Sequence, residues 1–120
     1  MNISDIEKIA SETRLEFENG KVDRNKVIDL YWRKNPANRK FDVGSLSSTL
    51  NIFPYNNCGL VSVYLESLIP DSKVVEGKYG LRYHDFILVQ ESIIVDITAD
   101  QFGGPKVYVG KLRSPWSLGV

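Results

Sequence analysis

The sequence predicts an α+β fold in which N-terminal helices and a Cys-bearing central helix pack on a mainly antiparallel sheet. Residues 1–52 carry apolar side chains at helical spacing, whereas residues 72–112 contain runs of β-forming side chains between turn residues. One apolar helix joins the two regions. Helices followed by a run of strands are typical of the α+β class. We therefore expect one domain over residues 1–120, with a helical part at 1–52 and a core at 53–120.

The two N-terminal helices have recognisable start and stop signals. Ser4 and Glu7 fit a capping box, so the first helix is expected to begin at Ser4 and to end at Asn19-Gly20. A second helix should run from Asp23 to about Lys34, because the Asn-Pro pair that follows ends it. Both helices carry an apolar face at helical spacing, which predicts that they cover the core.

The middle of the chain predicts one short and one long helix. A short third helix is expected within Asp42–Asn51. The central helix should run from Cys58 to about Ile69, with Asn57 as its N-cap and Pro70-Asp71 after its end. Apolar side chains recur along the central helix at helical spacing, so one of its faces is expected to enter the core.

Four strands should follow the central helix. Each is rich in β-branched or aromatic residues and is bounded by glycine, proline or charged turns. Strands grouped after the helices indicate a mainly antiparallel sheet. The expected strands are Lys73–Tyr79, His84–Val89, Ile93–Thr98 and Lys106–Leu112.

The composition narrows the possible functions. Basic and acidic residues number 15 each, so the formal net charge is zero, which argues against a nucleic-acid-binding protein. With one cysteine and one histidine, neither an intramolecular disulfide nor a transition-metal site is expected, and we predict no cofactor. The sequence shows neither an apolar signal region nor a run of about 20 apolar residues. We therefore expect a cytoplasmic protein that does not span a membrane.

The single cysteine and the single histidine stand where a thiol enzyme needs them. Cys58 begins the central helix, His84 opens a strand, and Asp96 lies in the next strand. This order is that of a nucleophile, its base and the carboxylate that orients the base. Free backbone N–H groups at a helix start favour a thiolate over a thiol. These three residues are the candidate catalytic triad, and no metal is expected.

Further candidates surround the cysteine. The backbone N–H of Cys58 can donate to an oxyanion, and the side chain of Asn56 or Asn57 is a candidate second donor. Gln101 is a candidate to line the cleft, although capping of a turn explains it equally well. Trp116 is expected to anchor the end of the chain to the core rather than to cover the cleft. Taken alone, a lone cysteine on an apolar helix face is more often a packing residue.

Asp96 is unusual in its own right. It interrupts the run Ile93–Thr98, which is otherwise apolar enough for a buried strand. A buried acid needs a cationic or N–H partner, and His84 on the neighbouring strand is suitable. If Asp96 instead faces water, Asp100 or Asp85 is the fallback partner of the histidine.

The length of one turn tests the pairing of His84 with Asp96. A two-residue turn at Glu91-Ser92 would point Asp96 away from His84, because successive side chains of a strand face opposite sides. A three-residue turn, Gln90-Glu91-Ser92, would place the two side chains diagonally on one face and within reach. The triad therefore predicts an odd-length turn or a bulge.

Three segments together resemble a known superfamily. Asn57-Cys58-Gly59 at a helix start, the run His84–Val89 and the run Ile94–Thr98 resemble the core of the transglutaminase-like and wider papain-like thiol enzymes, to which the arylamine N-acetyltransferases are related. The resemblance covers about residues 55–102. The stretch Asp96–Gly103 also resembles small bacterial members of this group. The N-terminal helices match nothing in the superfamily.

The resemblance implies a role for each triad residue. Cys58 would be the nucleophile, His84 the general base and then the general acid, and Asp96 the residue that orients His84. Arylamine N-acetyltransferases and full transglutaminases are far longer, so their substrate pockets have no counterpart in this chain. No calcium-binding acidic loop is evident in the sequence, which argues against calcium-dependent cross-linking.

We therefore expect a cysteine-dependent hydrolase or acyltransferase that acts on an amide, ester or thioester through an acyl-enzyme on Cys58. Its substrate would be a peptide, a protein or a small acyl compound. The alternative is a non-catalytic protein-binding domain on the same fold, such as an immunity or adaptor protein, in which Cys58 and His84 are core residues. A nucleotide or RNA binder is disfavoured because the sequence lacks a Gly-rich phosphate loop. The oligomeric state stays open.

Overall fold

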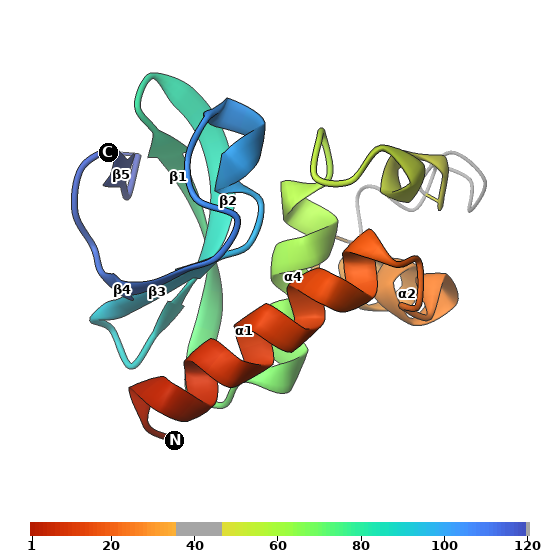
Figure 1. Ribbon diagram of the computed structural model, residues 1–120, viewed down its shortest axis with the longest axis horizontal. Helices are drawn as coiled ribbons and strands as arrows, with labels where there is room; N and C mark the ends of the chain where they lie inside the picture. Colours follow the sequence, from red (N-terminus) through yellow and green to blue (C-terminus); the bar gives the residue numbers. More distant parts are fainter. Residues whose placement is uncertain (36–46, 120) are drawn as a thin grey trace.

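A computed structural model describes residues 1–35 and 47–119 (Figure 1). The helices come first along the chain and the strands follow them, so the predicted α+β class is confirmed. The helical elements that precede the sheet are α1 (Ile3–Glu18), α2 (Arg24–Lys34), the short 3-10 helix η2 (Leu50–Ile52) and the central helix α4 (Cys58–Leu68).

Five strands form one sheet in the order β4-β3-β2-β1-β5, and each neighbouring pair is antiparallel. A 3-10 helix, η3 (Ala99–Phe102), separates the third strand from the fourth. The strands are β1 (Ser72–Tyr79), β2 (Arg82–Val89), β3 (Ile93–Asp96), β4 (Tyr108–Lys111) and β5 (Trp116–Ser117).

Helix α1 begins earlier than predicted. Its N-cap is Asn2, whose Oδ1 accepts a hydrogen bond from the Asp5 N–H at 2.9 Å, while the Asp5 carboxylate accepts one from the Asn2 N–H at 3.4 Å. The predicted capping box of Ser4 and Glu7 is therefore wrong, because the pair Asn2 and Asp5 satisfies the free N–H groups two residues sooner. The predicted stop holds, since Asn19 is the C-cap.

The predicted bounds of α2 and α4 are confirmed within one residue. Asp23 caps α2 by accepting from the N–H groups of the second and third residues after it. The short helix expected within Asp42–Asn51 falls partly outside the described residues. Its described end, residues 47–49, is helical and continues into η2. None of the helices in the described part of the chain has the length and apolar character needed to cross a membrane.

The predicted three-residue turn between β2 and β3 is confirmed. Val89 pairs with Ile93, which leaves Gln90, Glu91 and Ser92 in the turn. Gln90 and Glu91 have φ angles of 52° and 63°, and these left-handed conformations reverse the chain. The register therefore places His84 and Asp96 on the same face of the sheet.

The bounds of all four predicted strands differ from the prediction, and one strand was missed. β1 begins one residue earlier, at Ser72, and β2 begins two residues earlier, at Arg82, so His84 lies within a strand rather than at its start. β3 ends at Asp96 rather than Thr98, because the backbone N–H of Thr98 donates to the Asp96 carboxylate at 2.9 Å and turns the chain towards η3. β4 is likewise shorter than the predicted Lys106–Leu112. β5 has only two residues, too few to leave a periodic pattern in the sequence.

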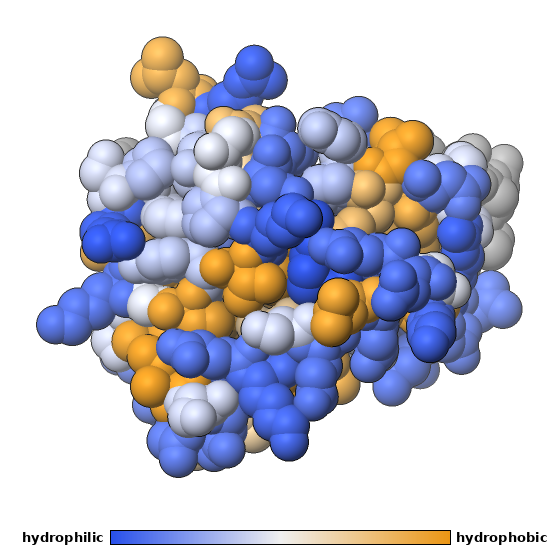
Figure 2. Space-filling view, in the orientation of Figure 1, coloured by the Kyte–Doolittle hydropathy of each residue, from blue (hydrophilic) through white to orange (hydrophobic). Residues whose placement is uncertain are grey.

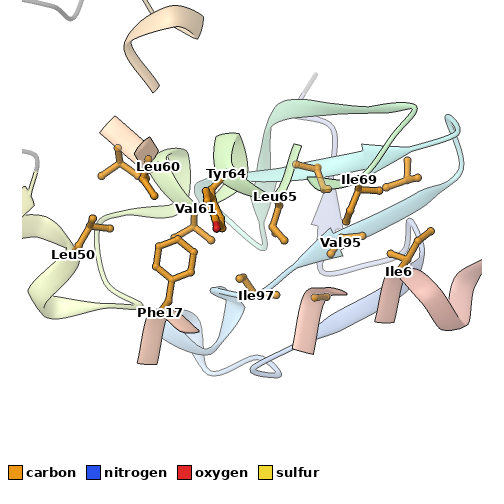
Figure 3. Close-up of a cluster of buried hydrophobic side chains, with 14 residues drawn as sticks. Ile6, Phe17, Leu50, Leu60, Val61, Tyr64, Leu65, Ile69, Val95 and Ile97 are labelled. Carbon is orange, nitrogen blue, oxygen red and sulfur yellow. The ribbon is translucent and has the colours of Figure 1, made fainter. Parts of the chain in front are cut away.

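The helices cover one face of the sheet and enclose the larger core (Figures 1 and 3). Helix α4 packs against β1 and β2, and α1 packs against β4. Because apolar side chains from all three helices meet those of β2 and β3, their removal from water holds the layers together. The buried residues labelled in Figure 3 are Ile6, Phe17, Leu50, Leu60, Val61, Tyr64, Leu65, Ile69, Val95 and Ile97.

The opposite face of the sheet curls over a second, smaller core. The rings of Tyr108 on β4 and Trp116 on β5 stack with their centroids 4.1 Å apart, so the two edge strands meet across the concave face. Gly77 on β1 makes this possible, because a Cβ there would collide with the Ser117 carbonyl oxygen and the Phe86 ring. The predicted anchoring of Trp116 is confirmed, since it is buried in this core.

Candidate active site

Cys58 is the first residue of α4 and lies at the edge of a cleft. The cleft has a volume of about 440 Å³ and lies between the start of α4, the segment before it, and the ends of β2 and η3. The Cys58 side chain is partly exposed, unlike the buried packing residue that a lone cysteine most often is. The residues around the cysteine in this cleft include Asn56, Asn57, Gly59, Arg82, Gln101 and Phe102.

His84 and Asp96 form a buried pair. The His84 Nε2 lies 2.7 Å from the Asp96 Oδ2, and the two side chains are 0% and 1% exposed. Both emerge on the concave face, where the three-residue turn has set them diagonally across β2 and β3. The contact between His84 and Asp96 that the sequence predicted is therefore present.

Asp96 is held by three further hydrogen bonds. The Trp116 Nε1 donates to Oδ2 at 2.8 Å, and the Thr98 backbone N–H and hydroxyl donate to Oδ1 at 2.9 Å and 3.3 Å. Each carboxylate oxygen thus has two donors, so the carboxylate cannot rotate without breaking two of its four contacts. A carboxylate fixed in this way fixes the plane of the His84 ring as well.

The other ring nitrogen of His84, Nδ1, is not bound by Asp96. Nδ1 is buried and has no well-aligned hydrogen-bond partner among the described residues, yet the Cys58 side chain is near enough to act on the imidazole. Burial lowers the pKa of His84, but the Asp96 hydrogen bond, the Cys58 interaction and the Asp96 charge outweigh burial and raise this pKa to about 9. At neutral pH His84 is therefore an imidazolium.

Aromatic rings enclose the imidazole on the concave face. Phe102 presents its ring at right angles to His84 with the centroids 5.2 Å apart, and Phe86 lies at 6.1 Å. Tyr79 stacks on Phe102 at 5.8 Å. These rings help to exclude water from the pair of His84 with Asp96, whose side chains are almost completely buried.

The three predicted oxyanion or substrate residues all reach the cleft, but their donors differ. Asn57 is buried and occupies the predicted N-cap position of α4, but its Oδ1 accepts no capping hydrogen bond, and its Nδ2 donates to the Thr49 carbonyl at 3.0 Å. Asn56 is exposed and has a φ of 61°. Gln101 has a buried Nε2 with no partner among the described residues. Gln101 is thus the side chain that brings an unpaired amide donor to the cleft of Cys58.

Neither fallback acid is the partner of His84. Asp100 accepts two hydrogen bonds from the buried Arg14, at 2.7 Å and 2.8 Å. Arg14 also donates to the Ile97 carbonyl at 2.8 Å, so α1 holds the segment between Asp96 and Gln101 in place. Asp85 lies on the helix face of β2, opposite to His84. Neither acid is hydrogen-bonded to the histidine.

Replacing Trp116 with phenylalanine is expected to lower the free energy of unfolding by about 1.5–3 kcal/mol, the usual contribution of a hydrogen bond to a charged group. Phenylalanine keeps an aromatic ring against Tyr108 but removes the N–H that binds Asp96. Urea denaturation measures the change. Trp32→Phe is the matched control, because the buried Trp32 Nε1 has no partner among the described residues. Equal losses in the two variants would contradict the role given to the Trp116 N–H.

The sequence did not predict three of the groups that hold the site. Trp116 was expected only to anchor the chain, and Phe102 was not expected to touch His84. Arg14 was the third omission, and its place on the mostly apolar inward face of α1 was the available signal. No group of three or more His, Cys, Asp or Glu side chains within residues 1–35 and 47–119 has the geometry to hold a metal ion.

Comparison with protein families, with curated proteins and with solved structures gave no match. The resemblance to papain-like and transglutaminase-like enzymes therefore stays a prediction from the sequence. A proposal about function must therefore start from the geometry of Cys58, His84 and Asp96.

Proposed function

We propose that the protein is a cysteine-dependent hydrolase or acyltransferase that forms an acyl-enzyme on Cys58. The observation that carries this proposal is the arrangement around His84. One ring nitrogen is held by Asp96 at 2.7 Å, whereas the other has no hydrogen-bond partner in the described part of the chain, and the Cys58 side chain raises the pKa of the imidazole. A base that is oriented on one side and faces a thiol at a helix start on the other is the arrangement that thiol acyl chemistry needs.

The mechanism begins from a thiolate and an imidazolium. A cation beside a thiol and the N–H groups of a helix start both favour the thiolate. The Cys58 sulfur attacks the substrate carbonyl carbon, and the carbonyl oxygen becomes an oxyanion that the Cys58 N–H and the Gln101 Nε2 are proposed to bind. His84 gives its proton to the leaving group as the bond to the carbonyl carbon breaks.

The second half of the reaction releases the acyl group. Neutral His84 removes a proton from water or an amine, which attacks the thioester carbon, and the C–S bond breaks to restore the Cys58 thiolate. Asp96 holds the imidazole in one orientation throughout. The acyl donor is proposed to be a peptide, a protein or a small acyl compound, with an amide, ester or thioester bond.

The surface beside the cleft favours a peptide or protein over a small compound. The tip of the β1–β2 hairpin is apolar and projects from the surface (Figure 2), and Leu81 at this tip is 98% exposed. Tyr83, which lines the cleft, is 83% exposed. A peptide or protein bound at the cleft would cover these two side chains and remove their apolar surface from water.

Thiol labelling tests the proposal. At pH 6 we expect iodoacetamide to alkylate Cys58 at least about tenfold faster than the same thiol in guanidinium-unfolded protein, because an unperturbed thiol is then almost entirely protonated. His84→Ala should remove this excess reactivity. Mass spectrometry follows one site only, since the chain has one cysteine.

A second histidine variant keeps this test decisive if His84→Ala does not fold. His84→Gln offers Asp96 a neutral N–H and retains no positive charge, so it should also lose the excess reactivity while remaining folded by circular dichroism. Labelling of the wild-type protein no faster than that of the unfolded chain would overturn the proposal. If the labelling is fast, the protein is next incubated with p-nitrophenyl acetate, and mass spectrometry shows whether an acetyl group remains on Cys58.

The second candidate is a non-catalytic protein-binding domain. The complete burial of His84 and Asp96 favours it, because a buried ion pair also serves to fix one structure. In that function Cys58 would label slowly, and His84→Gln would change stability without changing the labelling rate.

We propose a cytoplasmic location for the protein. A nucleophilic thiol with no cysteine partner in the chain must stay reduced, and cytosolic glutathione and thioredoxin maintain that state. No cofactor takes part in the proposed reaction.

A further inference from the structure

The Cys58 cleft has an acidic wall on the side away from His84. Side chains alternate along β2, so Asp85 points to the helix face while His84 points to the concave face. Asp85 reaches the cleft beside Gly59, where an added Cβ would lie 3.1 Å from the Asp85 Oδ2. Asp85, Gly59 and Cys58 all line this cleft. A carboxylate therefore stands next to the residue that follows the proposed nucleophile.

The Asp85 carboxylate has no counterion among the residues that the structure describes. No lysine or arginine in the described part of the chain pairs with it, and no side chain or backbone N–H there donates to it; the ion pairs of this part lie elsewhere. Its cross-strand neighbour is Glu76, which has the same charge. Burial and the charge of Glu76 raise the pKa of Asp85, and His84 opposes them. A cation bound here would offset both the burial of the Asp85 charge and its repulsion by Glu76.

Asn57 supplies a second, independent acceptor in the same cleft. The side chain is only 2% exposed, and its Oδ1 is buried without a partner in the described structure. The Nδ2 donates to the Thr49 carbonyl, which can only accept, so the orientation of the amide is fixed. A buried oxygen that lines a cleft and lacks a donor points to a ligand that brings one.

The acidic lining continues beyond Asp85. A second hollow of about 410 Å³ shares Tyr31, Gly59 and Asp85 with the Cys58 cleft. Its wall adds Glu76 and Glu66, of which Glu66 is neutralised by Lys34 at 2.8 Å, and Lys73 also lines it. On the other side of the cleft, Arg82 lies over the Phe102 ring, 5.7 Å from its centroid. The unneutralised negative charge thus gathers at the Asp85 end.

We propose that Asp85 and Asn57 form a subsite for a cationic nitrogen group of the substrate, a primary ammonium or a guanidinium. Such a group donates several N–H bonds and carries the charge that Asp85 lacks, so it satisfies the carboxylate and the amide oxygen together. The subsite rests on the proposed thiol chemistry, because it selects which acyl compounds reach Cys58. It predicts lysine-like or arginine-like groups close to the carbonyl under attack.

Two matched alkylating reagents test the subsite. One is N-(2-aminoethyl)chloroacetamide, which carries an ammonium, and the other is N-propylchloroacetamide, which is uncharged. In each reaction the Cys58 sulfur bonds to the methylene carbon and chloride leaves. Rates are divided by those of glutathione with the same reagent. We expect the cationic reagent to be favoured by about tenfold at low salt, the effect of one partly screened charge pair, and by less at high salt.

The decisive readout is the ratio of the two rates. In Asp85→Asn the ratio should fall to about one, whereas the matched control Glu12→Gln, which removes an exposed charge on α1, should keep the wild-type ratio. A ratio near one in the wild-type protein, or an unchanged ratio in Asp85→Asn, would overturn the subsite. Failure of the thiol function looks different: both reagents would then react no faster with Cys58 than with glutathione, and His84→Gln would change neither rate.

Discussion

Replacing Asp96 with asparagine is expected to lower the free energy of unfolding by about 3–5 kcal/mol, the usual cost of breaking a buried ion pair. The carboxylate accepts four hydrogen bonds, two at each oxygen. An asparagine amide must turn its NH₂ group towards either the donors of His84 and Trp116 or those of Thr98. On that side two hydrogen bonds are lost, and buried N–H or O–H donors are left without an acceptor. Urea denaturation followed by circular dichroism measures the loss.

The control for this variant is Asp29→Asn. Asp29 forms an ion pair with Arg33 at 2.8 Å on the exposed side of α2, where both side chains are more than half exposed. Removing such a pair is expected to change stability by less than about 1 kcal/mol. A similar small change in Asp96→Asn would mean that the buried network contributes little to folding.

The second large effect is a loss of stability at alkaline pH. The pKa of His84 is raised to about 9 in the folded protein, whereas an unfolded histidine titrates near pH 6.5. The folded state therefore holds the proton more tightly. Protonation of His84 therefore contributes on the order of 3 kcal/mol to the free energy of unfolding. This contribution is complete below about pH 6.5 and is lost as the pH rises through about 9.

Unfolding by urea at pH 6 and at pH 9.5 measures this effect. The free energy of unfolding of the wild-type protein should be lower at pH 9.5 than at pH 6. In His84→Gln this decrease should be smaller, by on the order of 3 kcal/mol. Comparison of the two proteins removes the contribution of other groups that titrate in this range. Parallel losses in both would show that His84 holds its proton no more tightly in the folded state.

Local signals were enough to predict most of the fold. The Asn-Pro pair and the turn residues defined the ends of α2, α4 and the β2 strand because these signals act within a few residues. The capping box of α1 was misplaced because Asn2 and Asp5 fit the same pattern as Ser4 and Glu7. Two overlapping patterns of equal quality cannot be ranked without knowledge of what each helix end packs against.

The contact between His84 and Asp96 was predictable because it depends only on the geometry of two neighbouring strands. Once the turn after Val89 has three residues, the alternation of side chains places His84 and Asp96 together. The contacts of Trp116 and Arg14 were not predictable in this way. They join segments 20 and more than 80 residues apart, and no local pattern encodes such pairings.

The short strand β5 has a consequence for the order in which the molecule is made. Asp96 receives one of its four hydrogen bonds from Trp116, which leaves the ribosome 20 residues later. A growing chain that already contains Cys58, His84 and Asp96 therefore still lacks one of the donors that fix the carboxylate. Pairing of β5 with β1 therefore completes the hydrogen bonding of Asp96, and the carboxylate is fully fixed only when the last strand of the sheet is in place.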